Sequence, residues 1–568
     1  MIEIREISPP RKLSGLSSFL LKFPYNPQIV DVVKSFSPAV FDKKNLTWEI
    51  SSSYLSQLLD QLTYLDDIQL TLLPGEIKEI SFEPLTENEI KSFRYSPYNH
   101  QVEAINFGLK QEHSKWLLLD GMGLGKTLEA MYLAETLYSR GEIEHCLIIC
   151  GVDSLRTNWK KEISKFSNLS CVVLGEYITK SGKTRYKTIP ERAKQLKEKI
   201  SEFFIIVNAA TIRDSQIIEA FNKSVNKIDM IVVDEAHRMS NASSTQGANL
   251  KKLNAKYKLS MTGSLITNNP ESCYLPLSWT ENDSSTLTNF KSQYCTYGGF
   301  GGKQVIGYKN LDLLKEELES CSLRRTFDQV KGNMPKKTVE FETVELSDDH
   351  LKLYDAVVNG VKEEVDKVEL STGNLLALTT RLRQATTAPG ILTTENINNE
   401  KLNRAVEIIE DILSQGEKIV VFSTFIEPCN LLAAKLQKFQ PLLATGEIPD
   451  DIVQRNIDDF RNSKNYNLLI CTHQKAGTGY SMPECHYLLM IDFPWTYYAF
   501  SQSCDRIYRI TSEQPVFIKA LVAQGTIDER VKEIVETKKD LQDYLVDGVN
   551  NNISKGLASE MRDILLSL

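Results

Sequence analysis

A glycine-rich segment, Asp120–Thr127, follows an apolar run directly and reads Asp-Gly-Met-Gly-Leu-Gly-Lys-Thr. A strand that runs into such a turn and then into a helix points backbone N–H groups at phosphate oxygens, where a lysine neutralises charge and a threonine hydroxyl ligates Mg²⁺. The segment therefore predicts a phosphate-binding loop. The residues expected to contact the nucleotide are Gly121, Met122, Gly123, Leu124, Gly125, Lys126 and Thr127, and Thr127 is also an expected ligand of Mg²⁺.

A second apolar run, Ile231–Val233, ends in the sequence Asp-Glu-Ala-His at positions 234–237. At the end of a neighbouring strand, Asp234 can hold Mg²⁺ and Glu235 can position and polarise the attacking water. The first motif alone leaves open a glycine-rich turn without a nucleotide, because Asp120 replaces the first glycine of the usual pattern. The two motifs together predict ATP hydrolysis, with Lys126 and Glu235 in catalytic roles.

Composition limits the possible partners. The 568 residues predict roughly three to four domains, and 42% apolar residues suffice for several cores. A net charge of −8 excludes a general attraction to nucleic acid, so a polyanion must meet local basic patches. Ten cysteines without a C-x-x-C pair, and only seven histidines, argue against a zinc site and for reduced thiols in a reducing compartment.

The amino-terminal 20 residues lack the cationic start and apolar core of a secretory signal. No apolar stretch approaches the roughly 20 residues needed to cross a bilayer. We therefore expect no membrane partner and a location in the cytoplasm, at the nucleoid or, in a eukaryote, in the nucleus.

Short apolar runs of strand length alternate with helix-like segments in two blocks, a pattern typical of α/β units. Because the runs are almost continuously hydrophobic, their strands should be covered on both faces and mostly parallel. The fold class predicted is therefore α/β, with two parallel-sheet lobes. The expected strands are Trp116–Leu119, Cys146–Cys150, Phe204–Val207, Met230–Val233 and Lys258–Met261 in the first block, and Lys418–Phe422, Asn467–Cys471, Tyr487–Ile491 and Val516–Val522 in the second.

Few such runs occur between the two blocks, where Leu311–Leu323 and His350–Val368 are helix candidates. An amino-terminal unit is separated from the first block by Pro84 and a polar stretch. The predicted organisation is an accessory domain at 1–85, a first lobe at 86–280, a helical insertion or connector at 281–400, a second lobe at 401–545 and a tail at 546–568.

Three further groups of residues are candidates for contacts with ligands. Gln101, just before the phosphate loop, has an amide that can both donate to and accept from an adenine edge, although a solvated glutamine is the ordinary state. The segments Ser154–Trp159 and Met261–Ser264 follow expected strands, on the edge where parallel sheets bind ligands. Ordinary helix caps explain them about equally well.

A basic helix candidate closes the second block. On a helix, Gln502, Arg506 and Arg509 share one face, and two guanidinium groups could stabilise the γ-phosphate in the transition state. The alternative is a surface helix in which Asp505 pairs with Arg509.

Residues 180–199 hold eight Lys or Arg against two Glu, a local charge of +6 in an acidic chain. Contact with a phosphate backbone and a solvated charged helix are both open interpretations of this run.

Taken in order, these motifs resemble the superfamily-two helicases and, among them, the Swi/Snf-type DNA translocases. The resemblance covers roughly residues 90–545 and implies ATP and Mg²⁺ as cofactors, adenine contact for Gln101 and γ-phosphate contacts for Arg506 and Arg509. Its further marks are Trp159, Met261–Ser264, Leu323-Arg324-Arg325, Met334-Pro335, Arg381–Gln384 with Pro389, Phe422-Ser423, Gln502–Arg509 and Gly525–Glu529.

The amino-terminal unit resembles the HARP domain of annealing helicases, and a generic small α/β domain is the alternative. Its marks are Phe23–Asn26, Val33-Lys34, Phe41-Asp42, Thr47-Trp48, Tyr54 and Leu58-Leu59. The chain departs from the Swi/Snf pattern at Gly121, Ser481 and Thr511-Ser512, which affects the subfamily assignment and not the hydrolytic groups.

The resemblance implies an ATP-dependent translocase on double-stranded or forked DNA that acts in strand annealing, fork remodelling, repair, replication or recombination. Single-strand-binding or replication proteins are candidate partners. A strand-separating helicase on DNA or RNA remains an alternative. A non-hydrolysing scaffold that binds branched DNA is another, and phosphate release would exclude it.

Overall fold

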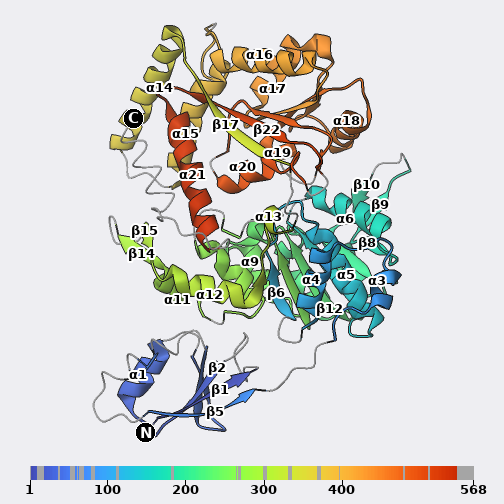
Figure 1. Cartoon of the computed structure of the whole chain (residues 1–568), viewed down its shortest axis with the longest axis vertical. Helices are drawn as coiled ribbons and strands as arrows, with labels where there is room; N and C mark the ends of the chain where they lie inside the picture. The colour runs from blue at the N-terminus through green and yellow to red at the C-terminus, as the bar shows by residue number, and fades with distance from the viewer. Residues whose placement is uncertain are drawn as a thin grey trace.

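Three units make up the computed structural model, and Figure 1 shows them one above another: a second lobe, a first lobe and a small amino-terminal unit. The tail 546–568 lies outside the described residues, as do Tyr54, Ser264, Met334 and Thr511. The residues described are 2–8, 18–35, 39–51, 58–59, 62, 70–77, 83–110, 114–151, 153–180, 184–263, 265–266, 270–283, 285–298, 304–330, 335–367, 372–395, 397–476, 480–494, 496–509 and 512–545.

The first lobe is built on a seven-stranded sheet in which every described pairing is parallel. All five strands expected here are present, so the predicted α/β class is confirmed. In spatial order the strands are β16 (Ser322–Leu323), β6 (Lys115–Leu118), β13 (Tyr257–Met261), β12 (Ile228–Asp234), β7 (His145–Cys150), β11 (Phe204–Asn208) and β8 (Cys171–Val173).

Alternating side chains of these strands enter two separate cores, because successive residues of a strand point to opposite faces. In β7, for example, Cys146 and Ile148 pack on one side and Leu147 and Ile149 on the other. The first face is covered by α4 (Asn99–Leu109), α5 (Lys126–Ser139) and α6 (Asp153–Phe166), and the second by α7 (Ile189–Leu196), α8 (Ser215–Asn222), α9 (Thr245–Leu250) and α10 (Tyr274–Trp279).

Smaller elements complete the first lobe. A third core lies beneath α11 and α12. The remaining elements are α3 (Glu87–Ser92), α11 (Leu287–Tyr294), α12 (Leu311–Cys321), the 3₁₀ turns η3 (Thr211–Arg213), η4 (Ala236–Met239) and η5 (Pro270–Cys273), and two hairpins formed by β9 (Glu176–Ile178) with β10 (Thr184–Tyr186) and by β14 (Cys295–Gly298) with β15 (Gln304–Tyr308).

The second lobe has a six-stranded sheet, again parallel in every described pairing, and it contains all four expected strands. In spatial order they are β17 (Lys337–Val344), β22 (Val516–Ala523), β21 (Tyr487–Met490), β18 (Ile419–Ser423), β20 (Leu468–Thr472) and β19 (Leu442–Ala444). The helical elements are α14 (Asp348–Lys367), α15 (Thr372–Thr387), η7 (Pro389–Ile391), α16 (Glu400–Ser414), α17 (Ile426–Lys435), η8 (Gln437–Phe439), α18 (Asp450–Asn462), α19 (His473–Ala476), α20 (Tyr497–Cys504) and α21 (Ile527–Leu545).

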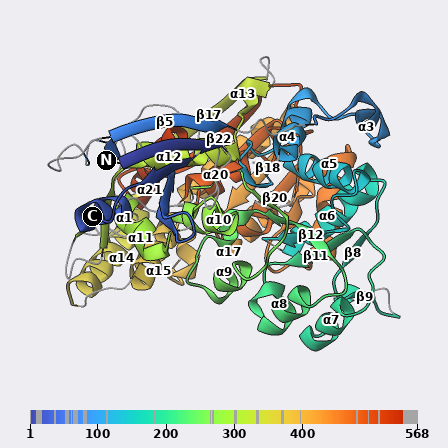
Figure 2. The ribbon, with the colours of Figure 1, turned by 90° about the horizontal axis from the view of Figure 1, so that it is seen from below.

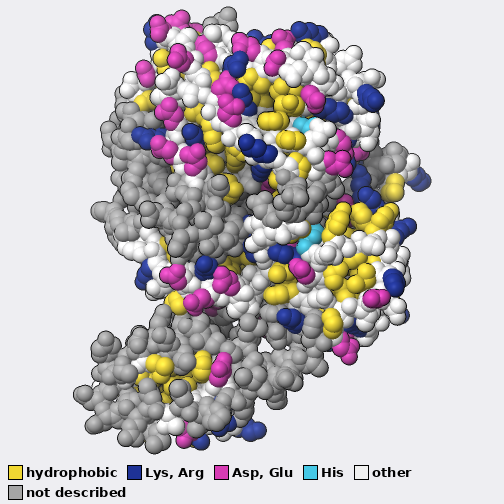
Figure 3. Space-filling view, in the orientation of Figure 1, with side chains coloured by type: hydrophobic (Ala, Val, Ile, Leu, Met, Phe, Trp, Pro, Cys, Tyr) yellow, Lys and Arg dark blue, Asp and Glu magenta, His cyan; other side chains and the backbone are white. Residues whose placement is uncertain are grey.

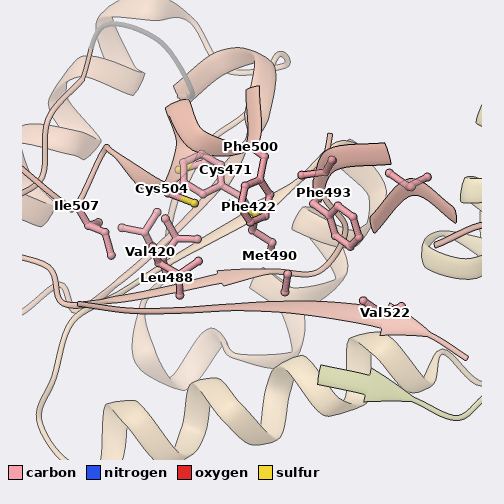
Figure 4. Packing of buried hydrophobic residues seen from close by; sticks show 14 of the residues in the cluster. Val420, Phe422, Cys471, Leu488, Met490, Phe493, Phe500, Cys504, Ile507 and Val522 are labelled. Atoms are coloured by element: carbon pink, nitrogen blue, oxygen red, sulfur yellow. The ribbon is translucent and has the colours of Figure 1, made fainter. Parts of the chain in front are cut away.

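One face of this sheet carries the larger core, where Val420, Phe422 and Met490 pack with Phe500 of α20 and with Ile507 in the turn after that helix (Figure 4). Helices α16 and α17 cover the opposite face. Figure 1 shows α21 running from this lobe down towards the first one. Both sheets are therefore covered on both sides, as their hydrophobic runs indicate.

The region expected as a helical insertion, 281–400, contributes a strand to each sheet. β16 pairs with β6 of the first lobe, and β17 pairs with β22 of the second. The expected helices are present as α12 and α14, and α14 packs together with α15 in the second lobe's core. This region is divided between the two lobes, and its chain crosses from one to the other between β16 and β17.

The amino-terminal unit contains a five-stranded mixed sheet and the helix α1 (Pro27–Ser35), and the described residues 58–59 and 62 are also helical. Figure 1 shows this unit below α11 and α12 of the first lobe, and in the view from below it lies in front of that lobe (Figure 2). Leu313 of α12 packs against the small core of this unit. The strands, in spatial order, are β3 (Ala39–Asp42), β4 (Thr47–Ser51), β2 (Ser18–Lys22), β1 (Ile2–Ser8) and β5 (Leu70–Ile77).

The ten cysteines are free thiols, and all but the half-buried Cys171 are buried, which agrees with the prediction of reduced core residues. Across the described ranges, no helix combines the length and the apolar character needed to span a bilayer.

Candidate nucleotide site between the lobes

The phosphate loop leaves β6 at Leu118 and ends where α5 begins at Lys126. Gly123 and Gly125 have φ angles of 88° and 96°, which side-chain-bearing residues rarely adopt. Gly263 approaches the loop closely, because a Cβ atom there would lie 2.4 Å from the Met122 side chain. These glycines allow the loop to curl over the amino terminus of α5, where free N–H groups can meet an anion.

The Lys126 ammonium lies inside this loop. Its Nζ donates to the carbonyl oxygens of Asp120 (2.7 Å) and Gly121 (3.2 Å). Burial lowers the pKa of Lys126, while the nearby carboxylate of Glu235 opposes that shift. Phosphate oxygens can replace the two carbonyls as acceptors, which suits the predicted role of Lys126.

Asp120, which replaces the first glycine of the loop pattern, is fully buried and ion-paired with Arg325. The Arg325 Nε lies 3.2 and 3.1 Å from the two carboxylate oxygens, and its Nη2 also donates to Glu129 (3.1 Å). The backbone N–H of Gly121 donates to the Arg325 carbonyl at 2.9 Å. A buried carboxylate requires such a partner, so the departure at Asp120 is compensated by Arg325.

Asp234 and Glu235 follow β12 directly. One Asp234 oxygen accepts from the indole N–H of Trp159 (2.8 Å) and the other from the Glu235 N–H (2.9 Å). Burial and the adjacent Glu235 charge raise the pKa of Asp234 to about 7. Burial also disfavours the charged form of Glu235, but His237 and Lys126 outweigh it and hold its pKa at about 2. Glu235 is thus the carboxylate that stays ionised.

Glu235 itself has a left-handed backbone (φ 52°), which is costly for a residue with a side chain. His237 then connects this motif to the next strand, because its Nδ1 lies 3.3 Å from Glu235 Oε2 and 3.0 Å from Thr262 Oγ1. The Met261–Ser264 segment was predicted either to bind a ligand or to act as an ordinary helix cap. In the structure its Thr262 is in contact with the acidic motif.

Gln101 is buried against the phosphate loop. Its Oε1 accepts from the Tyr98 N–H (3.0 Å), and its Nε2 lies 3.5 Å from the Leu124 carbonyl. A Cβ atom at Gly125 would lie 2.4 Å from the same Nε2. Gln101 thus supports the loop from behind, and its contact with adenine remains a prediction.

The second lobe places Arg506 and Arg509 at this site. Gln502 Nε2 lies 3.5 Å from Glu235 Oε1, and the Arg509 side chain lies against Gly123, where a Cβ atom would be 3.1 Å from the Arg509 Nη1. Arg506 donates to the carbonyls of Gln502 (3.0 Å) and Tyr480 (2.7 Å). Burial and the charge of Arg506 lower the pKa of Arg509 to about 9. An anion bound between the two guanidinium groups would relieve this repulsion.

Two details of the predicted arginine helix need correction. Helix α20 ends at Cys504, so Arg506 lies in the turn that follows it and Arg509 lies beyond that turn, outside any helix or strand. The alternative pairing of Asp505 with Arg509 is not formed. Asp505 is paired with Lys337 instead, at 2.9 Å.

These groups line one cleft of about 850 Å³. Gln101, the loop from Met122 to Thr127, Asp234 and Glu235 come from the first lobe. The second lobe adds α18 and the segments around Tyr480 and Arg506. Every predicted site residue except Gly121 lines the cleft, and Gly121 lies in the same loop with its carbonyl on Lys126. The sequence analysis named Arg325 only as part of a family motif and did not predict its pairing with Asp120. The acidic residue at the first position of the phosphate loop was the one sequence signal that a cation would be needed there.

The residues also fit a Mg²⁺ ion. The Thr127 hydroxyl and the Asp234 carboxylate line the same cleft. Mg²⁺ is usually held by one or two protein ligands together with phosphates and water, so no richer cage is required.

A phosphate loop defines one nucleotide-binding lobe, whereas a cleft completed by arginines from a second parallel-sheet lobe defines the class of two-lobed P-loop proteins. Within that class, residues 100–391 match the SNF2-related domain and residues 400–511 match the helicase conserved C-terminal domain. The first match covers more than half of the chain. The chain therefore belongs to the SNF2-related family, and the resemblance to Swi/Snf-type helicases is confirmed.

Several named proteins are similar to this chain. An uncharacterized ATP-dependent helicase of Mycoplasma pneumoniae is 26% identical over 539 residues, which are 90% of this chain and 49% of that protein. The RAD54-like DNA repair and recombination protein of Drosophila ananassae is 21% identical over 553 residues, 88% of this chain and 68% of that protein. The solved SWI2/SNF2 ATPase core of Sulfolobus solfataricus with dsDNA is 21% identical, with 86% of this chain and 97% of that chain covered and a TM-score of 0.36. The chain spans about half the length of the first curated relatives it matches.

Proposed function

We propose that this chain hydrolyses ATP between its two lobes and uses the cycle to move along DNA. The main support for this proposal is the shared cleft, which is lined by Lys126 and Glu235 of one lobe and by Arg506 and Arg509 of the other. The 3.5 Å approach of Gln502 to Glu235 brings the lobes together at the atom expected to act on water. Hydrolysis would thus depend on the lobes being closed.

Each group has a distinct chemical role in this proposal. Lys126 and the loop N–H groups bind the phosphates, and Thr127 with Asp234 would hold Mg²⁺, which screens the phosphate charge. Glu235, ionised over the whole neutral range, accepts a hydrogen bond from the attacking water and orients it. Arg506 and Arg509 stabilise the charge that develops on the γ-phosphoryl group.

The test is ATP hydrolysis by the purified chain with and without duplex, forked and single-stranded DNA. Lys126→Ala and Glu235→Gln should each abolish DNA-stimulated hydrolysis without changing the melting temperature. Glu235→Gln should still bind ATP, because the amide keeps the size of the side chain. Normal hydrolysis by either variant would refute the site. Stimulation by RNA alone would favour the RNA helicase alternative, and no phosphate release from the unmodified chain would favour the non-hydrolysing scaffold.

We further propose that the basic run at 180–199 contacts the DNA backbone. It forms β10, the end of the β9 hairpin and α7, with Lys183 outside the described residues. The hairpin is tied to the carboxyl edge of the sheet, since the Tyr186 ring lies 4.1 Å from the Arg156 guanidinium and Arg192 donates to Thr211 at 3.1 Å. The cations exposed on it are Lys180, Arg185, Lys187, Lys194, Lys197 and Lys199.

Their exposure favours phosphate contact over a salt-bridged helix, because none of the six forms an ion pair with another described residue. Figure 3 shows dark-blue side chains projecting at the edge of the molecule where Figure 1 places β9 and β10. Replacing Lys180, Arg185 and Lys187 by Ser should weaken binding to duplex DNA. The slope of log affinity against log salt should fall by about 0.9 per lost contact. Serines at Lys435, Lys438 and Lys464, exposed on the other lobe, are the matched control. An unchanged salt slope would contradict this contact.

Strand annealing is the finer proposal, and it depends on the amino-terminal unit. Its HARP-like marks include the Phe41 and Trp48 rings, which lie 5.1 Å apart across β3 and β4, with the Lys34 ammonium 6.0 Å from Trp48. An aromatic pair beside a cation suits stacking on unpaired bases. Rezipping of a melted DNA bubble should require ATP and should be lost in Trp48→Ala, with ATP hydrolysis retained. Unwinding of the same substrate would favour the helicase alternative.

A further inference from the structure

The chain passes from the first lobe to the second between β16 and β17, and the beginning of this connection is attached to the phosphate loop. Leu119 N–H donates to the Leu323 carbonyl (2.8 Å), and the next contacts are those of Arg325 with Gly121 and Asp120. The loop and the connection thus form one hydrogen-bonded unit.

The middle of the connection touches both lobes. In α13 (Phe327–Val330), the Phe327 ring packs so close to Gly123 that a Cβ atom there would lie 3.1 Å from it. The same ring lies 5.2 Å, edge to face, from the Tyr508 ring. Tyr508 directly precedes Arg509. A phosphate-loop glycine and the arginine segment are therefore in contact with the same side chain.

The end of the connection holds the arginine segment from behind. The Tyr508 hydroxyl donates to the Pro335 carbonyl (3.1 Å). Lys337, the first residue of β17, is paired with Asp505 at 2.9 Å, and its ammonium lies 5.3 Å from the Tyr508 ring. The Lys337 and Asp505 side chains are only 27% and 9% exposed. Although burial favours the neutral amine, Asp505 raises the pKa of Lys337, so the ammonium keeps its charge.

The arginine segment consequently has two faces. Arg506 and Arg509 line the cleft and Gln502 approaches Glu235, whereas Asp505 and Tyr508 contact the connection. Asp505 immediately precedes Arg506. A shift of Asp505 would therefore displace the neighbouring guanidinium group.

We propose that Lys337 is a positioning residue for the hydrolytic reaction: through Asp505 and Tyr508 it fixes the turn that carries Arg506 and Arg509, so that the connection sets the distance between arginines and phosphate loop. The inference rests on the proposed ATP hydrolysis. Lys337 touches neither nucleotide nor water. Its effect is confined to the step in which the arginines act, while nucleotide binding by the first lobe is independent of it.

The test is steady-state ATP hydrolysis by Lys337→Met in the full chain with saturating duplex DNA. We expect kcat to fall at least tenfold while KM for ATP and the affinity for a fluorescent ADP analogue stay within twofold. Lys337→Arg should keep most of kcat, because it preserves the charge. The matched control is Lys519→Met on the adjacent strand β22, which removes a lysine of similar exposure (28%) paired with Glu342 and away from the arginine turn.

A charge exchange checks the mechanism. Lys337→Asp combined with Asp505→Lys should recover several-fold more kcat than either single variant. A Lys337→Met protein with unchanged kcat, or one whose KM and kcat change equally, would overturn the proposal. If the unmodified chain hydrolyses no ATP, the proposed function fails instead, so the two failures are distinguishable. A lowered melting temperature with normal kcat would also count against a positioning role.

Discussion

The two lobes differ in what occupies the carboxyl edges of their parallel sheets. In the first lobe the edge is open: Asp234 and Glu235 follow β12 and line a cleft completed by groups from the other lobe. In the second lobe the corresponding edge is filled by its own side chains. Asp492, two residues after β21, is 2% exposed and paired with Arg383 at 3.2 Å.

The network around Asp492 uses nearly all of its acceptors. Ser423 Oγ donates to one oxygen at 2.6 Å, and the Thr424 N–H donates to the other at 2.9 Å. His473 Nε2 lies 3.0 Å from the Asp492 carbonyl. Arg383 also donates to the Phe493 carbonyl at 2.6 Å. The motifs around Arg383 and Ser423 therefore stabilise the second lobe, whereas those of the first lobe are arranged to receive a ligand.

The difference shows how two similar lobes can have unequal roles. A buried charge must be neutralised. Where the neutralising cation belongs to the same lobe, the result is a rigid support. Where it comes from the opposite lobe or from a ligand, binding and lobe closure become linked.

Arg506→Ala should have the largest effect, because it removes a group that the second lobe supplies to the open edge of the first. Removing a cation supplied across the cleft should lower kcat for ATP hydrolysis about 10³-fold or more, the effect typical of an arginine that stabilises phosphoryl transfer. Affinity for ADP, measured by fluorescence titration, should change little because the first lobe binds it. A kcat within tenfold of the unmodified chain would mean that the second lobe has no chemical part.

Arg383→Met should act on stability instead. It leaves Asp492 buried without its cation, which costs about 3–5 kcal/mol of unfolding free energy. Urea denaturation should show the second lobe unfolding first, with ADP binding by the first lobe retained below that transition. Lys438→Met, which breaks an exposed pair with Glu410, is the control and should cost under about 1 kcal/mol. Equal effects of the two variants would contradict the self-contained network.

Trp159→Phe should have a smaller effect, because it removes one hydrogen bond to Asp234 at the open edge of the first lobe. The indole N–H to Asp234 bond is lost, and hydrogen bonds to charged groups contribute about 1.5–3 kcal/mol. Because that bond lowers the pKa of Asp234, its loss should move the pKa above the present value of about 7. KM for Mg-ATP should therefore rise about tenfold at pH 7 and recover partly at higher pH. Trp279→Phe, whose N–H bonds Leu253 away from the cleft, should leave KM unchanged.

The smallest expected effect concerns the outer edge of the first lobe. Arg140 bonds Glu89 and, opposed by burial, holds the Glu89 pKa at about 2, below its usual 4.5. A depressed carboxyl pKa contributes stability above pH 4.5 that disappears as pH falls towards 2. Arg140→Met should thus cost about 1 kcal/mol at pH 7, and the difference from the unmodified chain should shrink as pH falls towards 2 in urea titrations. Arg140 also donates to the carbonyls of Glu83 (2.9 Å) and Pro84 (3.1 Å), and an undiminished difference at pH 2 would assign the loss to such pH-independent contacts.

Much of this fold follows from local sequence signals, and the rest depends on distant partners. The nine apolar strands inside the two large sheets were predictable because both of their faces are buried. The short or polar edge strands β8, β16, β17 and β19 were not, since alternation such as that in Lys337–Val344 also fits a surface segment. The phosphate loop and the acidic motif were predictable because each is a short pattern of neighbouring residues that follows an apolar run. The partners of Asp120 and Asp505 were not, because ion pairs between residues far apart in sequence leave no periodic signal.

The Asp120–Arg325 pair joins residues 205 positions apart. During synthesis the loop therefore emerges long before the cation that neutralises it, and the first lobe can reach its final arrangement only after residue 325 has left the ribosome. The same holds for fragments expressed in isolation. A truncation at the apparent domain boundary near residue 280 would leave a carboxylate buried without its counterion, whereas one ending beyond residue 326 would retain it.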